Sequence, residues 1–525
     1  MHISVDTNFI GGAAENIHFL SNNTIAFTAP QDGSTSQRSL WFYFRVTGAK
    51  GIGLTFVQEN MAHVLGIDET KSYTLARPVI REGKDGKWDR LPAKAVYFTA
   101  RPHRACFHAI PKSDETYIAF CYPYFYYDFI KFTQRHKEDE ISLKIIGESA
   151  EGRPFPMLLM GSPDEGKELL VCTCRHHAAE TPGSYVLEGL CDAFLSESPA
   201  GLYIRQRAII AVFPFVDIDG VHSGRYGKDT SPIDFNRDWT ENPRHVEIRM
   251  ILKEINKLRQ KFTYKGFFDF HAPQPGAFSY IVPLRRSISG DLKSKKVSEL
   301  ASRFAAKSQN FAACRPEDLD DNHLNWGQEN YQSVATAFNT LEFGVPAVTL
   351  ETSYHMDCEN RILTPELYHQ MGASYLEAIA ETYFDMPGAE YRKLSYRDFE
   401  ITWADWEMVT IPKNITWQES ANSLILKSLE YDNEIWVTHK KIIEPTTESS
   451  RYMLQAKGSA RIRIYVYFYP RGKNTPFGRS KAVNMFVEEC EIPFFCSEAA
   501  PLLDLQLRYS IKVEKLDGEL VISHY

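Results

Sequence analysis

The chain has 525 residues, of which 43% are hydrophobic and 24% charged, and this ordinary composition excludes a disordered polypeptide. Its 59 basic and 67 acidic residues give a net charge of −8, which disfavours a nucleic-acid-binding protein because such proteins need a basic surface. No run approaches about 18 consecutive apolar residues, so we expect no membrane-spanning helix and no membrane partner.

The length predicts several domains, at roughly 100–200 residues per domain. The opening residues have neither a charged stretch nor an apolar stretch of the secretory type, so no signal peptide is expected. The nine cysteines lie mostly inside apolar runs such as 168–174, which indicates buried free thiols rather than a disulfide framework. Together these features predict a soluble, multidomain, cytoplasmic protein.

Residues 1–140 have the pattern of an all-β region. Aromatic and β-branched runs of strand length are separated by clusters of Gly, Asp, Asn and Lys, without helical periods between them. This pattern predicts an N-terminal antiparallel β-sandwich domain. The runs are "SLWFYFRV" (39–46), "GIGLTF" (51–56), "KAVYFTA" (94–100) and "ETYIAFCYPY" (115–124).

From residue 141 to about 390, strands alternate with helices, which predicts an α/β domain with a mixed, mainly parallel sheet flanked by helices. Continuous apolar runs are typical of strands buried on both faces of such a sheet. They occur at 168–174, 208–216, 265–270 and 346–351. Helical patterns occur at 184–195, 245–262, 292–309 and 364–384, the last opening with Thr364 as N-cap and Pro365 in the first turn.

Residues 394–525 return to β patterns. The segment "ARIRIYVYFYP" (460–470) alternates apolar and polar residues before it becomes continuously apolar, and further strand candidates follow it. We expect a separate, small C-terminal β domain, whose role the sequence leaves open.

The segment "CRHHAAETPGSY" (174–185) joins a buried strand to a helix and carries the first candidate site. His177 and Glu180 are three residues apart, so both can turn towards one cation, and both are suitable zinc ligands. By itself H-x-x-E is a weak signal, because an acid at a helix start beside a loop histidine gives the same pattern. His176 is a competing ligand.

The segment "FFDFHAPQ" (267–274) places Asp269 and His271 at the carboxyl end of an apolar strand, which is where ligands bind in open α/β sheets. Since side chains alternate along a strand, the two share one side of the sheet. With His177 and Glu180, His271 completes the two-histidine, one-carboxylate ligand set of zinc hydrolases.

Further polar residues follow another buried strand in "FPFVDIDGVHSGRYGKDTSPIDFNRDW" (213–239). Arg225, Arg237 and Asn236 can bind a carboxylate, since arginine pairs with carboxylates through two parallel hydrogen bonds. Asp234 can hold the second ring nitrogen of a metal-ligating histidine. Surface salt bridges are the plain alternative for each of them.

Glu351 lies in the strand "VTLETS" (348–353), which is otherwise apolar. A buried carboxylate is costly unless it is paired or functional, and an acid near zinc can serve as a general base. The alternative is a structural acid satisfied by neighbouring amides.

In this order, H-x-x-E, D-x-N-R, D-x-H and T-x-E, the four motifs resemble those of the zinc metallocarboxypeptidases of the funnelin type. "RHHAAET", "DFNRDW" and "VTLETSYH" are similar to the R-V-H-P-G-E-T, D-L-N-R-x-W and Y-T-L-E-x-S motifs of the cytosolic carboxypeptidase subfamily. In the N-terminal region, "FYFRV", "KWDR" and "IAFCYPYFYYDF" resemble the same subfamily. The resemblance covers about residues 38–384.

The resemblance implies a peptidase that removes the last residue of a peptide or protein substrate, with one zinc ion per chain. It implies three zinc ligands, a general base, a partner for His177, and residues that hold the substrate. The zinc ligands are His177, Glu180 and His271, the general base is Glu351, and the partner of His177 is Asp234. The residues that hold the substrate are Asn236, Arg237 and Tyr331, of which Tyr331 corresponds to a mobile tyrosine over the substrate.

Two departures from the family pattern bear on catalysis and specificity. The family's G-N-Y-R, whose arginine polarises the scissile carbonyl, is here Gly224-Arg225-Tyr226-Gly227, so Arg225 is the expected catalytic arginine although it stands two residues earlier. Residues 333–338, "SVATAF", hold no basic residue where members that remove glutamate carry an arginine. We therefore expect a preference for neutral C-terminal residues.

Two alternative functions are compatible with the same residues. A zinc amidohydrolase that removes an acyl group from a small amino acid or a cell-wall peptide shares the ligand set. A non-catalytic binding protein on a peptidase scaffold is less favoured, because the three ligands and the base are all present.

Overall fold

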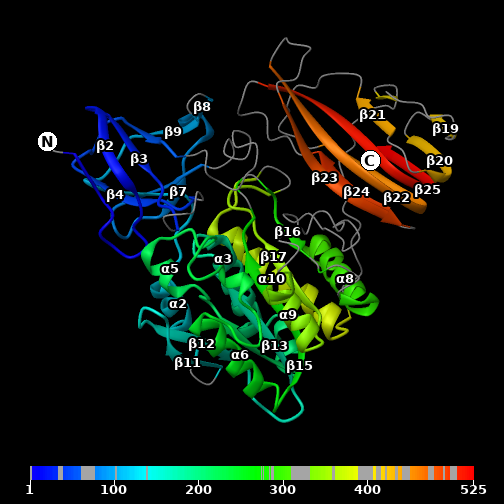
Figure 1. Ribbon diagram of the computed structural model, residues 1–525, viewed down its shortest axis with the longest axis horizontal. Coiled ribbons are helices and arrows are strands. Elements are labelled where there is room, and N and C mark those ends of the chain that lie inside the picture. The colour runs from blue at the N-terminus through cyan, green and yellow to red at the C-terminus, as the bar shows by residue number, and fades with distance from the viewer. Residues whose placement is uncertain are drawn as a thin grey trace. The chain divides into compact units, whose positions relative to one another are not determined.

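A computed structural model describes residues 3–32, 39–60, 77–100, 103–137, 140–273, 275, 277–282, 284, 289–308, 331–357 and 361–387, with the backbone of strands between 406 and 524 (Figure 1). Backbone contacts divide the chain into two units. The larger comprises residues 1–313, 325–357 and 362–388, and the smaller comprises residues 314–324, 358–361 and 389–525. The expected domain boundary at 390–394 lies outside the described residues.

The N-terminal region contains two five-stranded sheets. One has the order β1 (Ser4–Asp6), β4 (Tyr43–Thr47), β10 (Glu115–Ala119), β6 (Val79–Glu82) and β7 (Trp88–Arg90), and its pairs are antiparallel. The other has the order β2 (Glu15–Ser21), β3 (Thr24–Thr28), β5 (Leu54–Gln58), β9 (His103–Ala109) and β8 (Val96–Ala100).

Aromatic side chains join the two sheets. Phe44 on β4 lies 5.1 Å from Phe27 on β3 and 5.4 Å from Phe56 on β5, measured between ring centroids. The expected N-terminal antiparallel sheet is confirmed, with one departure: β3 and β5 pair in parallel. The chain passes through β4 in the other sheet between them, and such a crossover is what a parallel pair requires.

The central region is built on a seven-stranded mixed sheet, as the alternating pattern predicts. Its order is β11 (Ile141–Glu148), β12 (Pro154–Met160), β14 (Ala208–Phe213), β13 (Glu168–Cys174), β15 (Thr263–His271), β17 (Ala347–Glu351) and β16 (Tyr280–Val282). The inner strands β14, β13, β15 and β17 run parallel, whereas β11, β12 and β16 pair antiparallel at the edges. The parallel character is therefore confined to the buried centre.

Helices begin close to the residues that the sequence predicts. The helix expected at 184–195 starts three residues earlier, with Pro182 in its first turn, where a missing N–H costs little. Thr364 accepts a hydrogen bond from Leu367 N (3.4 Å) and caps the last helix as expected. The helices are α2 (Tyr126–Thr133), α3 (Thr181–Leu195), α4 (Pro199–Arg205), α5 (Ile218–Ser223), α6 (Val246–Leu258), α8 (Asp291–Lys307), α9 (Ala335–Glu342) and α10 (Pro365–Tyr383).

Alternation along β15 separates the two faces of the sheet. Phe268 and Phe270 contact Tyr375 of α10, with ring centroids 5.9 Å apart in both pairs. Phe267 contacts Trp239 on the other face at 5.6 Å, and Trp239 in turn contacts Phe338 of α9. Asp269 and His271 alternate with Phe268 and Phe270, so they share the face of Trp239, as the sequence predicts.

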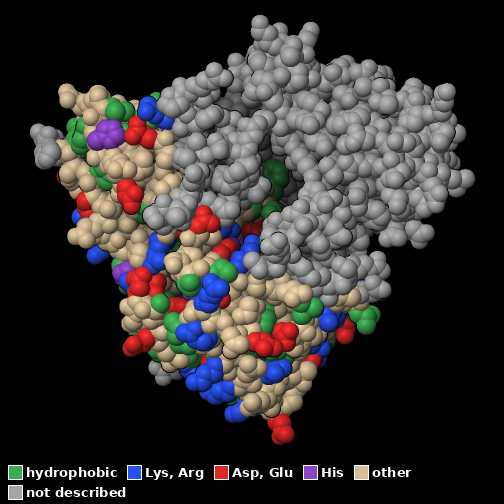
Figure 2. All heavy atoms as spheres, viewed as in Figure 1, with side chains coloured by type: hydrophobic (Ala, Val, Ile, Leu, Met, Phe, Trp, Pro, Cys, Tyr) green, Lys and Arg blue, Asp and Glu red, His purple; other side chains and the backbone are tan. Residues whose placement is uncertain are grey.

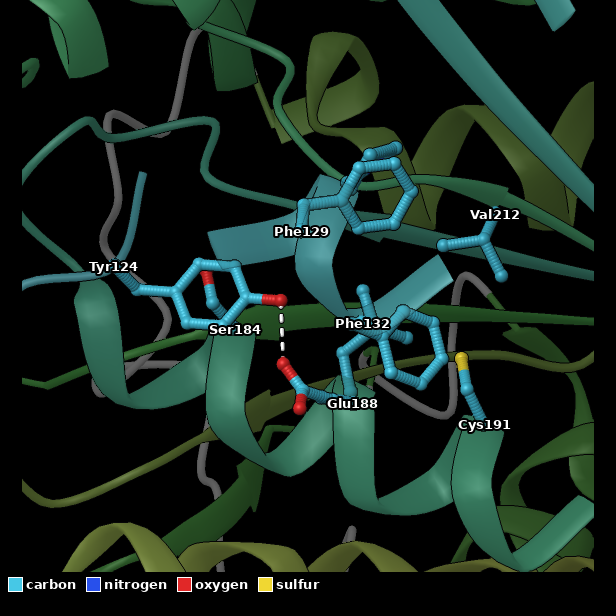
Figure 3. Close-up of a pocket in the computed structure, with 9 residues that line it drawn as sticks. Tyr124, Phe129, Phe132, Ser184, Glu188, Cys191 and Val212 are labelled. Atoms are coloured by element: carbon cyan, nitrogen blue, oxygen red, sulfur yellow. Dashed lines mark hydrogen bonds between the residues drawn. The ribbon is translucent and has the colours of Figure 1, made fainter. Parts of the chain in front are cut away.

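Helix α3 begins directly after the H-x-x-E segment, and contacts on two of its sides hold it in place. Gly372 of α10 lies so close to α3 that a Cβ there would stand 2.1 Å from Val186 O, so this contact needs glycine. On another side, Glu188 accepts hydrogen bonds from Tyr124 Oη and Arg135 Nη2, both 2.6 Å, beside a small pocket between α2 and α3 (Figure 3).

The C-terminal strands form one eight-stranded sheet, dominated by the long antiparallel pair β22 (Ser450–Pro470) and β25 (Leu505–His524). The other strands are β18 (Trp406–Met408), β19 (Thr416–Glu419), β20 (Ser423–Tyr431), β21 (Ile435–His439), β23 (Gly478–Glu488) and β24 (Glu491–Cys496). A search of the described residues finds no helix with the length and apolarity needed to cross a membrane. On the face shown in Figure 2, acidic and basic side chains of the described residues are interspersed.

Candidate metal and catalytic site

The side chains singled out in the sequence meet at the carboxyl ends of the parallel strands. In the strand register, Cys174 at the end of β13 adjoins Phe270, and His271 at the end of β15 pairs with Glu351 at the end of β17. The H-x-x-E segment follows β13, and Glu180 is the residue immediately before α3. One edge of the sheet thus gathers residues that are far apart in the sequence.

His177, Glu180 and His271 form one compact group. The two carboxylate oxygens of Glu180 lie 2.9 Å from His177 Nδ1 and 2.7 Å from His271 Nδ1. The two Nδ1 atoms are 3.2 Å apart, and one ligand atom from each residue lies within 4.8 Å of the others. All three are buried, with 4%, 0% and 1% of their surface exposed. The structure therefore brings together the three predicted metal ligands.

Each histidine of this group is held through its second ring nitrogen. His177 Nε2 lies 3.2 Å from Asp234 Oδ1, and His271 Nε2 lies 2.8 Å from Asp269 Oδ2. Both nitrogens that remain, the Nδ1 atoms, face Glu180. Carboxylates in this position orient metal-ligating histidines and increase their basicity, and the structure places the predicted Asp234 there.

These contacts decide the ionisation of the acids. Burial by itself raises the pKa of Glu180 and Asp234, but nearby histidines and Lys228 outweigh burial and lower both pKa values well below the usual range. Both side chains are therefore carboxylates at neutral pH. Two imidazole nitrogens and one carboxylate within reach of one another, with both histidines oriented from behind, are a donor set that suits zinc.

His176, the alternative metal ligand that the sequence offers, contacts Trp239 and Asp269 rather than Glu180. Its Nε2 accepts a hydrogen bond from Trp239 Nε1 (2.9 Å), and its Nδ1 lies 3.0 Å from Asp269 Oδ1. Its ring stacks on that of His271 at 5.3 Å. His176 therefore supports Asp269 and His271 from behind, while Glu180 is left to His177 and His271.

Glu351 is a buried acid beside this cluster, since it pairs with His271 in the strand register. It is 5% exposed, and its Oε2 has no hydrogen-bond partner among the described residues. Burial and the negative charge of Glu180 raise the pKa of Glu351 to about 7, although His271 and Lys228 act in the opposite direction. A buried acid that titrates near neutrality is suited to proton transfer.

Asn236 and Arg237 lie on a short turn next to His271. Asp234 Oδ1 accepts a hydrogen bond from Asn236 N (2.7 Å) and so caps this turn, η3 (Phe235–Arg237). Asn236 Nδ2 lies 3.3 Å from His271 Nε2, and Asn236 Oδ1 accepts from Ala335 N (2.9 Å). Arg237 Nη1 donates to Asn236 O (2.8 Å). The turn therefore connects the ligand cluster to the segment 333–338.

For two further predicted residues the structure shows no contact with the cluster among the described side chains. Arg225 forms an ion pair with Glu151, in the turn between β11 and β12. Tyr331 opens a short turn, η5 (Tyr331–Ser333), but its side chain lies outside the described residues.

Three residues that take part in the site were not predicted from the sequence. Lys228 Nζ lies 2.7 Å from Glu180 Oε1 and 2.8 Å from His177 Nδ1. Asp32, from the N-terminal region, accepts hydrogen bonds from the backbone of the same loop. Buried Arg175 donates from Nε to Ala178 O (2.9 Å) and from Nη1 to Tyr124 O (2.9 Å), and so shapes the H-x-x-E segment. A basic residue directly after "GRYG" was a signal for Lys228, whereas nothing in the sequence pointed to Asp32.

Comparison with known proteins agrees with this geometry. Residues 126–251 match the zinc carboxypeptidase family model, and residues 5–120 match that of the cytosolic carboxypeptidase N-terminal domain. Residues 126–251 are thus similar to zinc carboxypeptidases, and residues 5–120 are similar to the N-terminal domain of cytosolic carboxypeptidases. The first match includes His177, Glu180 and Asp234, and it ends before His271 and Glu351.

Several known proteins resemble the chain over different lengths. Mouse cytosolic carboxypeptidase 6 is 27% identical over 294 residues, which is 52% of this chain and 53% of that protein. An uncharacterised protein of Zymomonas mobilis is 24% identical, and the match covers 74% of this chain and 98% of that protein. A metallo-carboxypeptidase structure from Burkholderia cenocepacia has the same fold, with a TM-score of 0.63, 21% identity, and coverage of 73% of this chain and 99% of that one. The chain thus spans about half the length of the mouse protein.

Proposed function

We propose that this protein is a cytoplasmic, zinc-dependent metallocarboxypeptidase that hydrolyses the C-terminal peptide bond of a peptide or protein, with one zinc ion per chain. One observation carries the proposal: the ligand atoms of His177, Glu180 and His271 converge, and the buried acid Glu351 pairs with His271 at the ends of neighbouring strands. The match of residues 126–251 to the zinc carboxypeptidase family model supports it.

His177, Glu180 and His271 would hold the zinc ion, which would supply Lewis-acid chemistry and lower the pKa of a water molecule to about 7. Glu351 takes a proton from the attacking water as the water oxygen bonds to the carbonyl carbon of the scissile bond. Glu351 then gives the proton to the nitrogen of the leaving residue as the C–N bond breaks. Asp234 and Asp269 keep the two histidines oriented throughout.

Asn236 and Arg237 restrict the enzyme to chain ends. The substrate's terminal carboxylate can pair with the Arg237 guanidinium and accept a hydrogen bond from the Asn236 amide. The turn that carries both residues is capped by Asp234, so substrate binding and metal binding share one rigid element. A peptide without a free carboxylate loses this interaction.

The expected result with zinc-loaded protein is release of the terminal residue from N-blocked dipeptides. The same peptides with a C-terminal amide are matched controls and should react at least ten times more slowly. Chromatography of the released amino acids measures both rates. Hydrolysis of N-acyl amino acids without cleavage of the dipeptides would instead show the alternative function, a zinc deacylase.

The segment 333–338 predicts the preference for the terminal side chain. Val334, Ala335, Thr336 and Phe338 are buried and neutral. A glutamate side chain against them lacks a cationic partner at a cost of several kcal/mol, whereas an apolar side chain gains about 25 cal/mol per Å² buried. We therefore expect higher kcat/KM for peptides ending in Ala or Leu than for those ending in Glu. A tenfold preference for Glu would show that a more distant cation completes the pocket.

A further inference from the structure

The loop after α5 brings a lysine to the metal ligands. The ammonium group of Lys228 contacts Glu180 Oε1 at 2.7 Å and His177 Nδ1 at 2.8 Å, and the side chain is only 18% exposed. Its positive charge also acts on the carboxyl groups of Asp234 and Glu351. Lys228 is thus a cation in the wall of the site, and the proposed zinc ligands are its direct contacts.

The backbone of this loop is fixed from two sides. Gly227 has a φ of +91°, and a Cβ there would stand 2.4 Å from Ala178 N, so the loop lies directly against the H-x-x-E segment. On the other side, the Asp32 carboxylate accepts hydrogen bonds from Gly227 N (2.9 Å), Lys228 N (2.8 Å) and Asp229 N (3.1 Å). The starting point of the Lys228 side chain is therefore set by a residue of the N-terminal region.

The Arg225 side chain does not share the position of Lys228 beside Glu180 and His177. Its guanidinium group pairs with Glu151, which belongs to the turn between β11 and β12. Although Arg225 and Lys228 are three residues apart, the left-handed Gly227 (φ +91°) turns the chain between them. One side chain consequently faces the surface and the other faces the ligand cluster.

We infer that Lys228 is a catalytic residue of the proposed peptidase, donating a hydrogen bond to the scissile carbonyl oxygen, and that Asp32 is its positioning residue. This inference rests on the proposed function. As the water oxygen bonds to the carbonyl carbon, the π electrons of the C=O bond move to the oxygen, and the Lys228 ammonium stabilises the resulting negative charge. When the C–N bond breaks, the C=O bond re-forms, and the amine leaves with the proton that Glu351 delivers.

The flexible stem of lysine suits this role. A compact ammonium on four methylene groups can move by a few ångströms while its backbone stays held by Asp32. The ammonium group repels a second cation held by the same ligands, so Lys228 must also weaken metal binding. That consequence can be measured without any substrate.

The test compares Lys228→Met with Arg225→Met, which removes the neighbouring cation of the same loop. Lys228→Met should bind zinc at least tenfold more tightly in competition with a chelator, and its kcat on N-blocked dipeptides should fall about 10²–10³-fold with KM changed less than threefold. Arg225→Met should leave both quantities unchanged. Lys228→Arg should recover part of kcat, because it restores the charge with a different geometry.

Asp32 is tested by graded removal of its acceptor oxygens. Asp32→Ala should lower kcat about tenfold with little change in KM, whereas Asp32→Asn keeps one acceptor and should recover part of the loss. Thermal unfolding confirms that each variant is folded.

Three results would overturn the inference: wild-type kcat in Lys228→Met, a loss in Arg225→Met instead, or a loss limited to peptides ending in Glu. The last would make Lys228 a side-chain specificity residue. If the unaltered protein cleaves no peptide, the proposed function fails and the catalytic role fails with it, while tighter zinc binding by Lys228→Met still places its charge at the ligands.

Discussion

Glu351→Gln is expected to keep the fold and the bound zinc but to lose about three or more orders of magnitude in kcat. The amide has nearly the same size as the carboxylate, so packing at the end of β17 is preserved, but it cannot accept the proton of the attacking water. Steady-state kinetics on N-blocked dipeptides, with zinc content measured on the same sample, provide the comparison. Turnover like that of the unaltered protein would mean that Glu351 is structural.

The raised pKa of Glu351 predicts a second effect, on how the free energy of unfolding depends on pH. In the metal-free protein, burial raises the pKa of this carboxyl group from 4.5 to about 7, so the unfolded chain loses the proton at a lower pH than the folded protein does. Glu351 therefore reduces stability progressively as pH rises from about 4.5 to 7. Metal-free Glu351→Gln should be more stable than the unaltered protein at pH 8, by about 3 kcal/mol, and the difference should shrink towards pH 4.5.

The second large effect is expected for metal binding. Protein purified without chelator should carry about one zinc per chain, and His271→Ala should lose most of it, because two ligands hold zinc far more weakly than three. Elemental analysis measures the ratio. His222→Ala, which changes an exposed histidine of α5, is the matched control and should keep its zinc.

Variants of the supporting carboxylates refine this prediction. Asp234→Asn and Asp269→Asn leave the three ligands in place but weaken their orientation, so zinc affinity should fall by about 10–100-fold. Full zinc retention by His271→Ala would contradict the ligand assignment. An equal loss in His222→Ala would show that the change reflects unfolding rather than coordination.

Local patterns in the sequence were sufficient for the elements and for most of the site. Continuous apolar runs marked β13, β14, β15 and β17, because strands in the middle of a parallel sheet are buried on both faces. The alternation of Asp269 and His271 placed both on one face of β15, as the hydrogen bond between them confirms. These predictions succeeded because each depends on neighbours within a few residues.

Contacts between distant segments decided the rest. His176 and His177 are adjacent, yet a hydrogen bond from Trp239 and the contact with Asp269 hold His176 away from Glu180. Likewise, the sequence alone favoured Arg225 as the cation of the site, because it is the arginine of the family-like loop. The tertiary structure places Lys228 there instead, since Asp32, 195 residues away from Gly227 in sequence, holds the loop by its backbone amides. Residue types and short spacings thus determined which chemistry this chain carries, whereas long-range hydrogen bonds, which no local pattern encodes, decided which of two neighbouring side chains takes part in it.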